Sequence, residues 1–105
     1  MKVNPDPNYP IEVTLGHGFT ISLESIPTAG YTWNVEYDSK MIDLLKPKKY
    51  VPYSSAVGGG GWEIFEFQAK QPGETLIRAK YKRSWETNLL ETHLFKIHIT
   101  AENKL

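Results

Sequence analysis

The chain has 105 residues, and its 12 lysine and arginine residues balance its 12 aspartate and glutamate residues. This length fits one domain with a single core, and the even charge predicts no general attraction to nucleic acid or to an anionic membrane. Because the sequence contains no cysteine, disulfides, thiolate metal sites and cysteine nucleophiles are excluded.

In chain order, the first ten residues are polar and proline-rich, which indicates an N-terminal extension (1–10) and not a signal peptide. No later stretch approaches the ~18 apolar residues of a membrane span. The sequence leaves the compartment open, because a domain without disulfides can function in any of them.

Alternation of apolar and polar residues then continues through most of the chain and predicts short strands with one buried face. The expected strands cover residues 11–15, 19–24, 31–37, about 48–52, 62–69, 75–83 and 92–100. Residues 40–46 differ, because Met41, Leu44 and Leu45 have helical spacing and predict at most one short helical turn. The domain therefore spans residues 11–100, and a tail follows at 101–105.

Short strands separated by glycine- and proline-rich turns indicate an all-β fold, an immunoglobulin-like β-sandwich of about seven to eight antiparallel strands. Three of its connections are expected to emerge at one end of the sandwich, where loops on a rigid scaffold commonly serve recognition. We call them the wedge loop (25–30), the glycine loop (53–61) and the tryptophan loop (84–91).

The wedge loop combines a proline and a glycine around a small tip. Pro27 fixes its own φ angle, and Gly30 can adopt a positive φ and end the turn. Thr28 and Ala29 form a small tip that would fit a narrow cleft. Taken alone, this loop is better explained as an ordinary turn before a strand, because turn chemistry is commoner than binding.

The glycine loop contains four consecutive glycines, Gly58, Gly59, Gly60 and Gly61, which cost conformational entropy and pack no side chain. They would let bare backbone approach a partner and pair with it as a strand edge. A mobile tether is the plain structural alternative. A phosphate-binding loop is disfavoured, because no Gly-Lys-Ser/Thr motif follows.

The tryptophan loop places Trp85 beyond the alternating core residues, between Arg83 and Glu86. Tryptophan and arginine are the residue types most enriched in binding hot spots. A tryptophan that folds back over the strand ends would explain the same sequence without a partner.

Together these motifs resemble the chagasin family, protein inhibitors of papain-like cysteine peptidases. The family's Asn-Pro-Thr-Thr-Gly-Tyr motif is similar to residues 26–31, which end in Tyr31. Its Gly-x-Gly-Gly motif matches residues 58–61, and its Arg-Pro-Trp motif is similar to residues 83–85. The resemblance covers roughly residues 10–100, with the three motifs in order.

The resemblance implies reversible, non-covalent inhibition by a protein that is not an enzyme, binds no cofactor or metal and is a monomer when free. It implies that Pro27–Tyr31 cover the peptidase's catalytic Cys-His pair, with Thr28 nearest to it. Gly58–Gly61 would pair with substrate-groove backbone on one side, and Arg83 and Trp85 would bind on the other.

This chain departs from the family motifs at Ile26, Ala29 and Ser84, which replace Asn, Thr and Pro. The first two changes remove an amide that would brace the wedge loop and a hydroxyl near its tip. The third makes the tryptophan loop less rigid. These departures bear on the strength and spectrum of inhibition more than on its class.

Catalysis and metal binding have little support in the sequence. His93 and His98 lie five residues apart on one expected strand and face opposite sides, so they are not expected to share a metal, and His17 lies in a turn. His93 has core parity, whereas His98 is expected to face solvent. The acidic residues are expected to be solvated rather than to form an acid/base pair: Glu63, Glu66, Glu86 and Glu91.

The stronger alternative is an immunoglobulin-like adhesion or carbohydrate-binding module. Tyr50, Tyr53 and Trp62 would then form a stacking platform on a sheet face, although Trp62 shares the parity of Ile64 and is expected to be partly packed. Such a module would depend on Trp62 or Tyr53, whereas an inhibitor would depend on Thr28 and Trp85.

Overall fold

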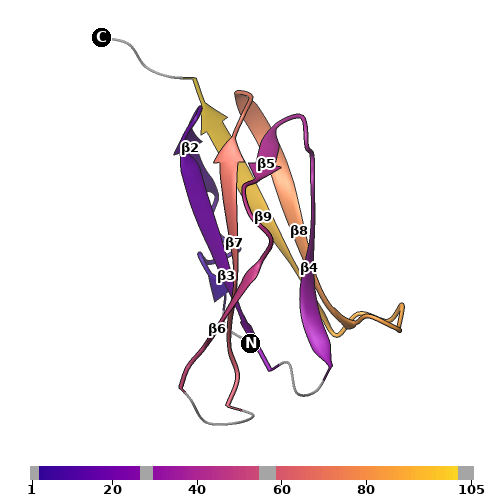
Figure 1. Cartoon of the computed structure of the whole chain (residues 1–105). Helices are drawn as coiled ribbons and strands as arrows, with labels where there is room; N and C mark the ends of the chain where they lie inside the picture. The colour runs from indigo at the N-terminus through magenta and orange to yellow at the C-terminus, as the bar shows by residue number, and fades with distance from the viewer. Residues whose placement is uncertain (1–2, 27–29, 55–58, 102–105) are drawn as a thin grey trace.

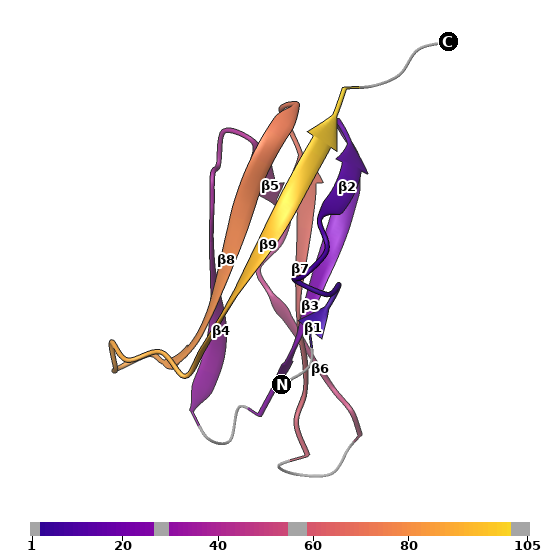
Figure 2. The same ribbon diagram turned by 180° about the vertical axis from the view of Figure 1, so that it is seen from behind.

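The computed structural model describes residues 3–26, 30–54 and 59–101, which form nine strands in two packed sheets (Figures 1 and 2). This confirms the expected all-β sandwich. Within these ranges there is no helix, and hence none long and apolar enough to cross a membrane.

Each sheet is assembled around long central strands. The first sheet contains β1 (Val3–Asn4), β3 (Gly18–Ser25), β7 (Gly61–Ala69) and β5 (Ile42–Leu44) in that order, and β6 (Lys49–Pro52) also pairs with β7. The second sheet has the order β2 (Ile11–Thr14), β9 (Glu91–Thr100), β8 (Gly73–Arg83) and β4 (Tyr31–Tyr37).

One strand pair departs from the expected antiparallel arrangement, because β2 runs parallel to β9. The chain enters along β1, which pairs antiparallel with β3, and then continues in the same direction as β2 beside the last strand. The strand β1 lies within the first ten residues and was not expected.

Residues 40–46 form no helix, in agreement with the expectation of at most one short helical turn: the Ile42 amide donates to the Asp38 carbonyl oxygen at 3.0 Å and closes a single turn. After a turn at 39–41, residues 42–44 form β5, which pairs with the end of β7. Ile42 is fully buried, although the helical interpretation counted Met41, Leu44 and Leu45 as its apolar face. Tertiary pairing with a long central strand outweighs the weak local preference of a seven-residue segment.

The core lies between the sheets and takes alternate residues from the long strands, as the period-2 pattern predicts. Its aromatic centre includes Trp33 and Tyr81, whose ring centroids lie 4.6 Å apart. The buried apolar residues are Val13, Ile21, Leu23, Trp33, Ile42, Phe65, Phe67, Ala69, Ile77, Ala79, Tyr81, Phe95, Ile97 and Ile99.

Candidate functional site

The described ends of the wedge, glycine and tryptophan loops lie at one end of the sandwich, which we call the loop end (Figures 1 and 2). In the first sheet Ser25 pairs with Gly61, which pairs with Pro52. In the second sheet Tyr31 pairs with Arg83. Pro27, Thr28, Ala29 and Gly58 lie outside the described residues.

Gly30 and Tyr31 set the direction in which the chain leaves the wedge loop. Gly30 has φ +84°, the left-handed conformation that the sequence predicts for the end of this turn. The ring of Tyr31 stacks on that of Tyr81, with centroids 5.4 Å apart. The chain therefore enters β4 with a defined direction.

The tryptophan loop leaves its indole in solvent beside the wedge loop. Trp85 is 71% exposed. A methyl group at Gly30 would lie only 2.9 Å from its Cη2 atom, so the indole rests directly on this glycine. The tryptophan loop therefore contacts the described end of the wedge loop, where an exposed aromatic side chain packs against a residue without a side chain.

The Arg83 side chain contacts the aromatic rings of both Tyr31 and Trp85. Its guanidinium carbon lies 4.6 Å from the centroid of the Tyr31 ring and 5.8 Å from that of Trp85. The guanidinium also forms an ion pair with Glu86, at 3.1 Å between Nη1 and Oε1. Cation–π contacts at such distances restrict both rings, so Arg83 links the wedge loop to the tryptophan loop.

The glycine loop owes part of its composition to the chain's own packing. A methyl group at Gly61 would lie 2.3 Å from the Val51 carbonyl oxygen, and one at Gly60 would lie 3.0 Å from that of Ser25. Gly60 also has φ +79°. Gly60 and Gly61 are buried, whereas Gly59 is exposed. A side chain at Gly60 would collide with β3 and one at Gly61 with β6, so the fold itself requires glycine at both positions.

A matched pair of substitutions tests whether Gly30 positions the indole of Trp85. Gly30 and Gly16 have nearly equal φ angles, +84° and +86°, but a methyl group at Gly16 meets nothing within 4 Å. Gly30→Ala and Gly16→Ala should each lower the free energy of unfolding by about 1 kcal/mol. If the protein inhibits peptidases, as the resemblance implies, only Gly30→Ala should also weaken that inhibition, by roughly tenfold, since it displaces Trp85.

Thermal unfolding and inhibition titrations of the two variants decide this point. Equal inhibition by both variants would show that the contact between Gly30 and Trp85 does not matter for binding.

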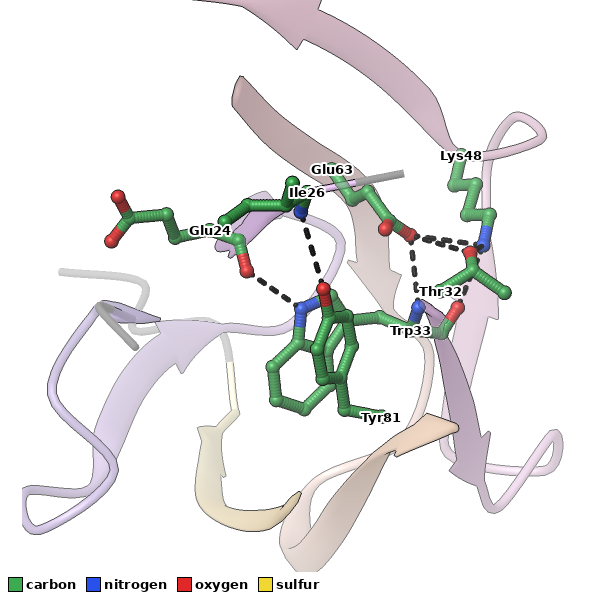
Figure 3. Close-up of polar contacts among 7 residues, drawn as sticks. All are labelled: Glu24, Ile26, Thr32, Trp33, Lys48, Glu63 and Tyr81. Atoms are coloured by element: carbon green, nitrogen blue, oxygen red, sulfur yellow. Dashed lines mark hydrogen bonds and ion pairs between the residues drawn. The ribbon is translucent and has the colours of Figure 1, made fainter. Parts of the chain in front are cut away.

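The carboxylate of Glu63 is buried against the start of β4, and the expectation that this residue is solvated was wrong. Glu63 was expected to be solvated, but it is 3% exposed. Its Oε1 atom accepts hydrogen bonds from Thr32 Oγ1 at 3.0 Å and from the Trp33 amide at 3.1 Å. Lys48 Nζ lies 2.9 Å from the same oxygen (Figure 3). The parity of Glu63 with Phe65 and Phe67 was the signal that could have identified it.

The histidines contact different carboxylates on different faces of β9. His93 is half-buried, as expected, with Nε2 2.7 Å from Glu91 and its ring 5.4 Å from that of Trp33. His98 lies on the outer face, 3.7 Å from Glu12. Within the described ranges, no three histidine or acidic side chains come together as metal ligands.

The aromatic residues of the alternative interpretation do not form a flat platform. Tyr53 meets Trp62 edge-on, with ring centroids 6.0 Å apart and an interplanar angle of 83°. Burial raises the pKa of Tyr53 to about 12, and a hydrogen bond with Glu24 adds to this shift. The Tyr53 hydroxyl is therefore protonated at neutral pH. The Tyr53 ring packs edge to face with the Trp62 indole, so the two rings do not offer a shared flat surface.

Comparisons with known proteins agree with the geometry. Residues 12–99 match the model of the family described as Chagasin family peptidase inhibitor I42. The chain is 27% identical to chagasin of Trypanosoma cruzi over 96 residues, which is 87% of each protein. The family consists of inhibitors rather than enzymes, which confirms the expectation that this protein is not an enzyme.

Two solved structures share the fold. The crystal structure of a cysteine protease inhibitor of Entamoeba histolytica has a TM-score of 0.72 and 22% identity, covering 86% of this chain and 84% of that one. The inhibitor PbICP-C, solved in complex with falcipain-2, has a TM-score of 0.57 and 18% identity, covering 90% and 87%. The family match spans most of the sequence and all the long strands, so the chain belongs to the chagasin family of peptidase inhibitors.

Proposed function

We propose that this protein inhibits papain-like cysteine peptidases reversibly and without covalent chemistry, by covering the active-site cleft with its loop end. The observation that carries this function is the position of Trp85. Its indole is 71% exposed and rests on Gly30, the described end of the wedge loop before β4. A large exposed aromatic side chain held in place by its neighbours is typical of a binding hot spot.

Each loop has a distinct part in this proposal. Pro27, Thr28 and Ala29 cover the catalytic Cys-His pair, with Thr28 nearest to it. The exposed Gly59, together with Gly58, pairs with backbone of the substrate groove, while Gly60 and Gly61 shape the loop from within the sandwich. Trp85, Arg83 and Tyr31 provide the contact on the leaving-group side.

The physical basis is pre-organisation. Long paired strands, aromatic stacking and the Arg83 contacts hold the described loop ends before the peptidase arrives, so little conformational freedom is lost on binding. A bent tip at the catalytic centre would also resist cleavage, because it does not present an extended peptide. A footprint of three adjacent loops is compatible with the ~1,600 Å² of a standard interface.

Titration of papain with the purified protein tests the proposal. We expect stoichiometric loss of activity at sub-micromolar inhibitor, recovery of activity after dilution, and recovery of the inhibitor uncleaved by mass spectrometry. An absence of inhibition by about 10 μM folded protein against papain and several cathepsin L-type enzymes would contradict it, since that bounds the binding free energy to weaker than about −7 kcal/mol.

A further inference from the structure

The wedge loop crosses from the first sheet to the second, and each end of it is held by a side chain from the opposite sheet (Figure 3). Tyr81 of the second sheet reaches the end of β3. Glu63 of the first sheet reaches the start of β4. In addition, Trp33 Nε1 donates a hydrogen bond across the sheets to the Glu24 carbonyl oxygen at 3.0 Å.

Tyr81 contacts both ends of the wedge loop. Its hydroxyl oxygen accepts a hydrogen bond from the Ile26 amide at 3.2 Å, immediately before the loop's tip. Its ring stacks on Tyr31 and on Trp33, immediately after the tip. Tyr81 is only 2% exposed, so a peptidase cannot contact it directly.

Glu63 fixes the start of β4 through three groups on one carboxylate oxygen: the Trp33 amide, the Thr32 hydroxyl and the Lys48 ammonium. Lys48 continues the network, since its Nζ donates to the Trp33 carbonyl oxygen at 2.8 Å and also contacts Thr32 Oγ1. Both backbone polar groups of Trp33 are therefore bound by side chains that come from outside its own sheet.

The ion pair of the buried Glu63 with the partly exposed Lys48 is weak support for stability, because the desolvation of the carboxylate offsets much of the attraction. An apolar residue at position 63 would fill the same space and avoid that cost. The network's distinctive effect is directional: it fixes where the chain leaves β3 and where it enters β4. These are the two points between which the wedge loop runs.

We infer that the Tyr81 hydroxyl and the Glu63 carboxylate are positioning residues for peptidase binding, which hold the two ends of the wedge loop in the binding geometry. This inference rests on the proposed function. If the network only selects the competent loop shape, weakening it lowers the competent fraction of free inhibitor. The association rate constant then falls, while the dissociation rate constant stays unchanged.

The test is Tyr81→Phe, which removes one hydroxyl and keeps the stacked ring. We expect the association rate constant for papain, measured by biolayer interferometry, to fall about 5- to 10-fold with dissociation within twofold of the wild type. Ile42→Val is the control, because Ile42 is fully buried in β5, outside the loop end. It should lower Tm yet leave both rate constants unchanged.

Glu63→Gln provides a second variant that keeps an acceptor for the Trp33 amide but removes the charge that Lys48 contacts. A smaller fall in the association rate constant, about threefold, is expected from it. An unchanged association rate constant in Tyr81→Phe, or a loss found only in dissociation, would overturn the inference while leaving the proposed function intact.

Amide hydrogen exchange separates this outcome from failure of the proposed function. In Tyr81→Phe the Ile26 amide should exchange at least about fivefold faster, while the amides of β5 keep their protection. If wild-type protein fails to inhibit any peptidase, the proposed function fails. Unchanged exchange at Ile26 would then show that the Tyr81 hydroxyl does not hold the loop either.

Discussion

Replacing Trp85 with alanine is expected to weaken papain inhibition by roughly 30- to 1,000-fold, the effect of losing about 2–4 kcal/mol at a binding hot spot. The side chain is 71% exposed in the free protein, so its removal creates no cavity in the core. Its contacts with Gly30 and Arg83 only orient it. Tm should therefore change by less than about 3 °C, as for a surface substitution.

The loss should lie mainly in the dissociation rate constant, because Trp85 contacts the partner directly in the proposed complex. This differs from Tyr81→Phe, whose effect should lie in association. Leu76→Ala is a suitable control, since Leu76 is 49% exposed on β8 toward the opposite end of the sandwich. Full inhibition by Trp85→Ala, or a large fall in its Tm, would show that the indole is structural.

Most of the fold could be predicted from the sequence because the long strands alternate strictly. Phe95, Ile97 and Ile99 on one face of β9 leave only one way for that strand to bury its apolar residues. Short strands carry no such pattern. The strand β1 has two residues and β5 has three, and both are defined by pairing with β3 and β7 rather than by their own sequence.

The residue type of Glu63 masked its position. Its parity matches that of Phe65 and Phe67, but glutamate is almost never buried without a partner. The Trp33 amide that binds Glu63 belongs to β4, and Lys48 lies in the segment before β6. No periodicity within β7 contains that information, so the burial of Glu63 depends on tertiary structure.

The candidate site shows the same division. The expected immunoglobulin-like topology placed the three loops at one end, because these three connections emerge together in such a sandwich. The contact of Trp85 with Gly30 could not be predicted, because it joins residues 55 positions apart through the geometry of two loops. The need for glycine at position 61 likewise depends on how closely β6 approaches β7.

That close approach makes Gly61→Ala the substitution with the largest expected effect on stability. The added methyl group would lie 2.3 Å from the Val51 carbonyl oxygen and 2.6 Å from Pro52 Cα. Both are backbone atoms of β6, so no side-chain rotation relieves the overlap. We expect a loss of about 2–3 kcal/mol, toward the upper end of overpacking costs, and a fall in Tm of roughly 10–20 °C.

Gly16→Ala is again the reference, because it removes the same glycine freedom from the unfolded chain and meets nothing within 4 Å. Its smaller loss measures the strain of a side chain at φ +86°, whereas Gly61 has no positive φ, so the loss in Gly61→Ala measures the overlap with β6. A Tm for Gly61→Ala equal to that of Gly16→Ala would mean that β6 moves aside at little cost. Such movement would also loosen Lys48, which directly precedes β6 and binds Glu63. In that case β6 would be too compliant to help hold the base of the wedge loop.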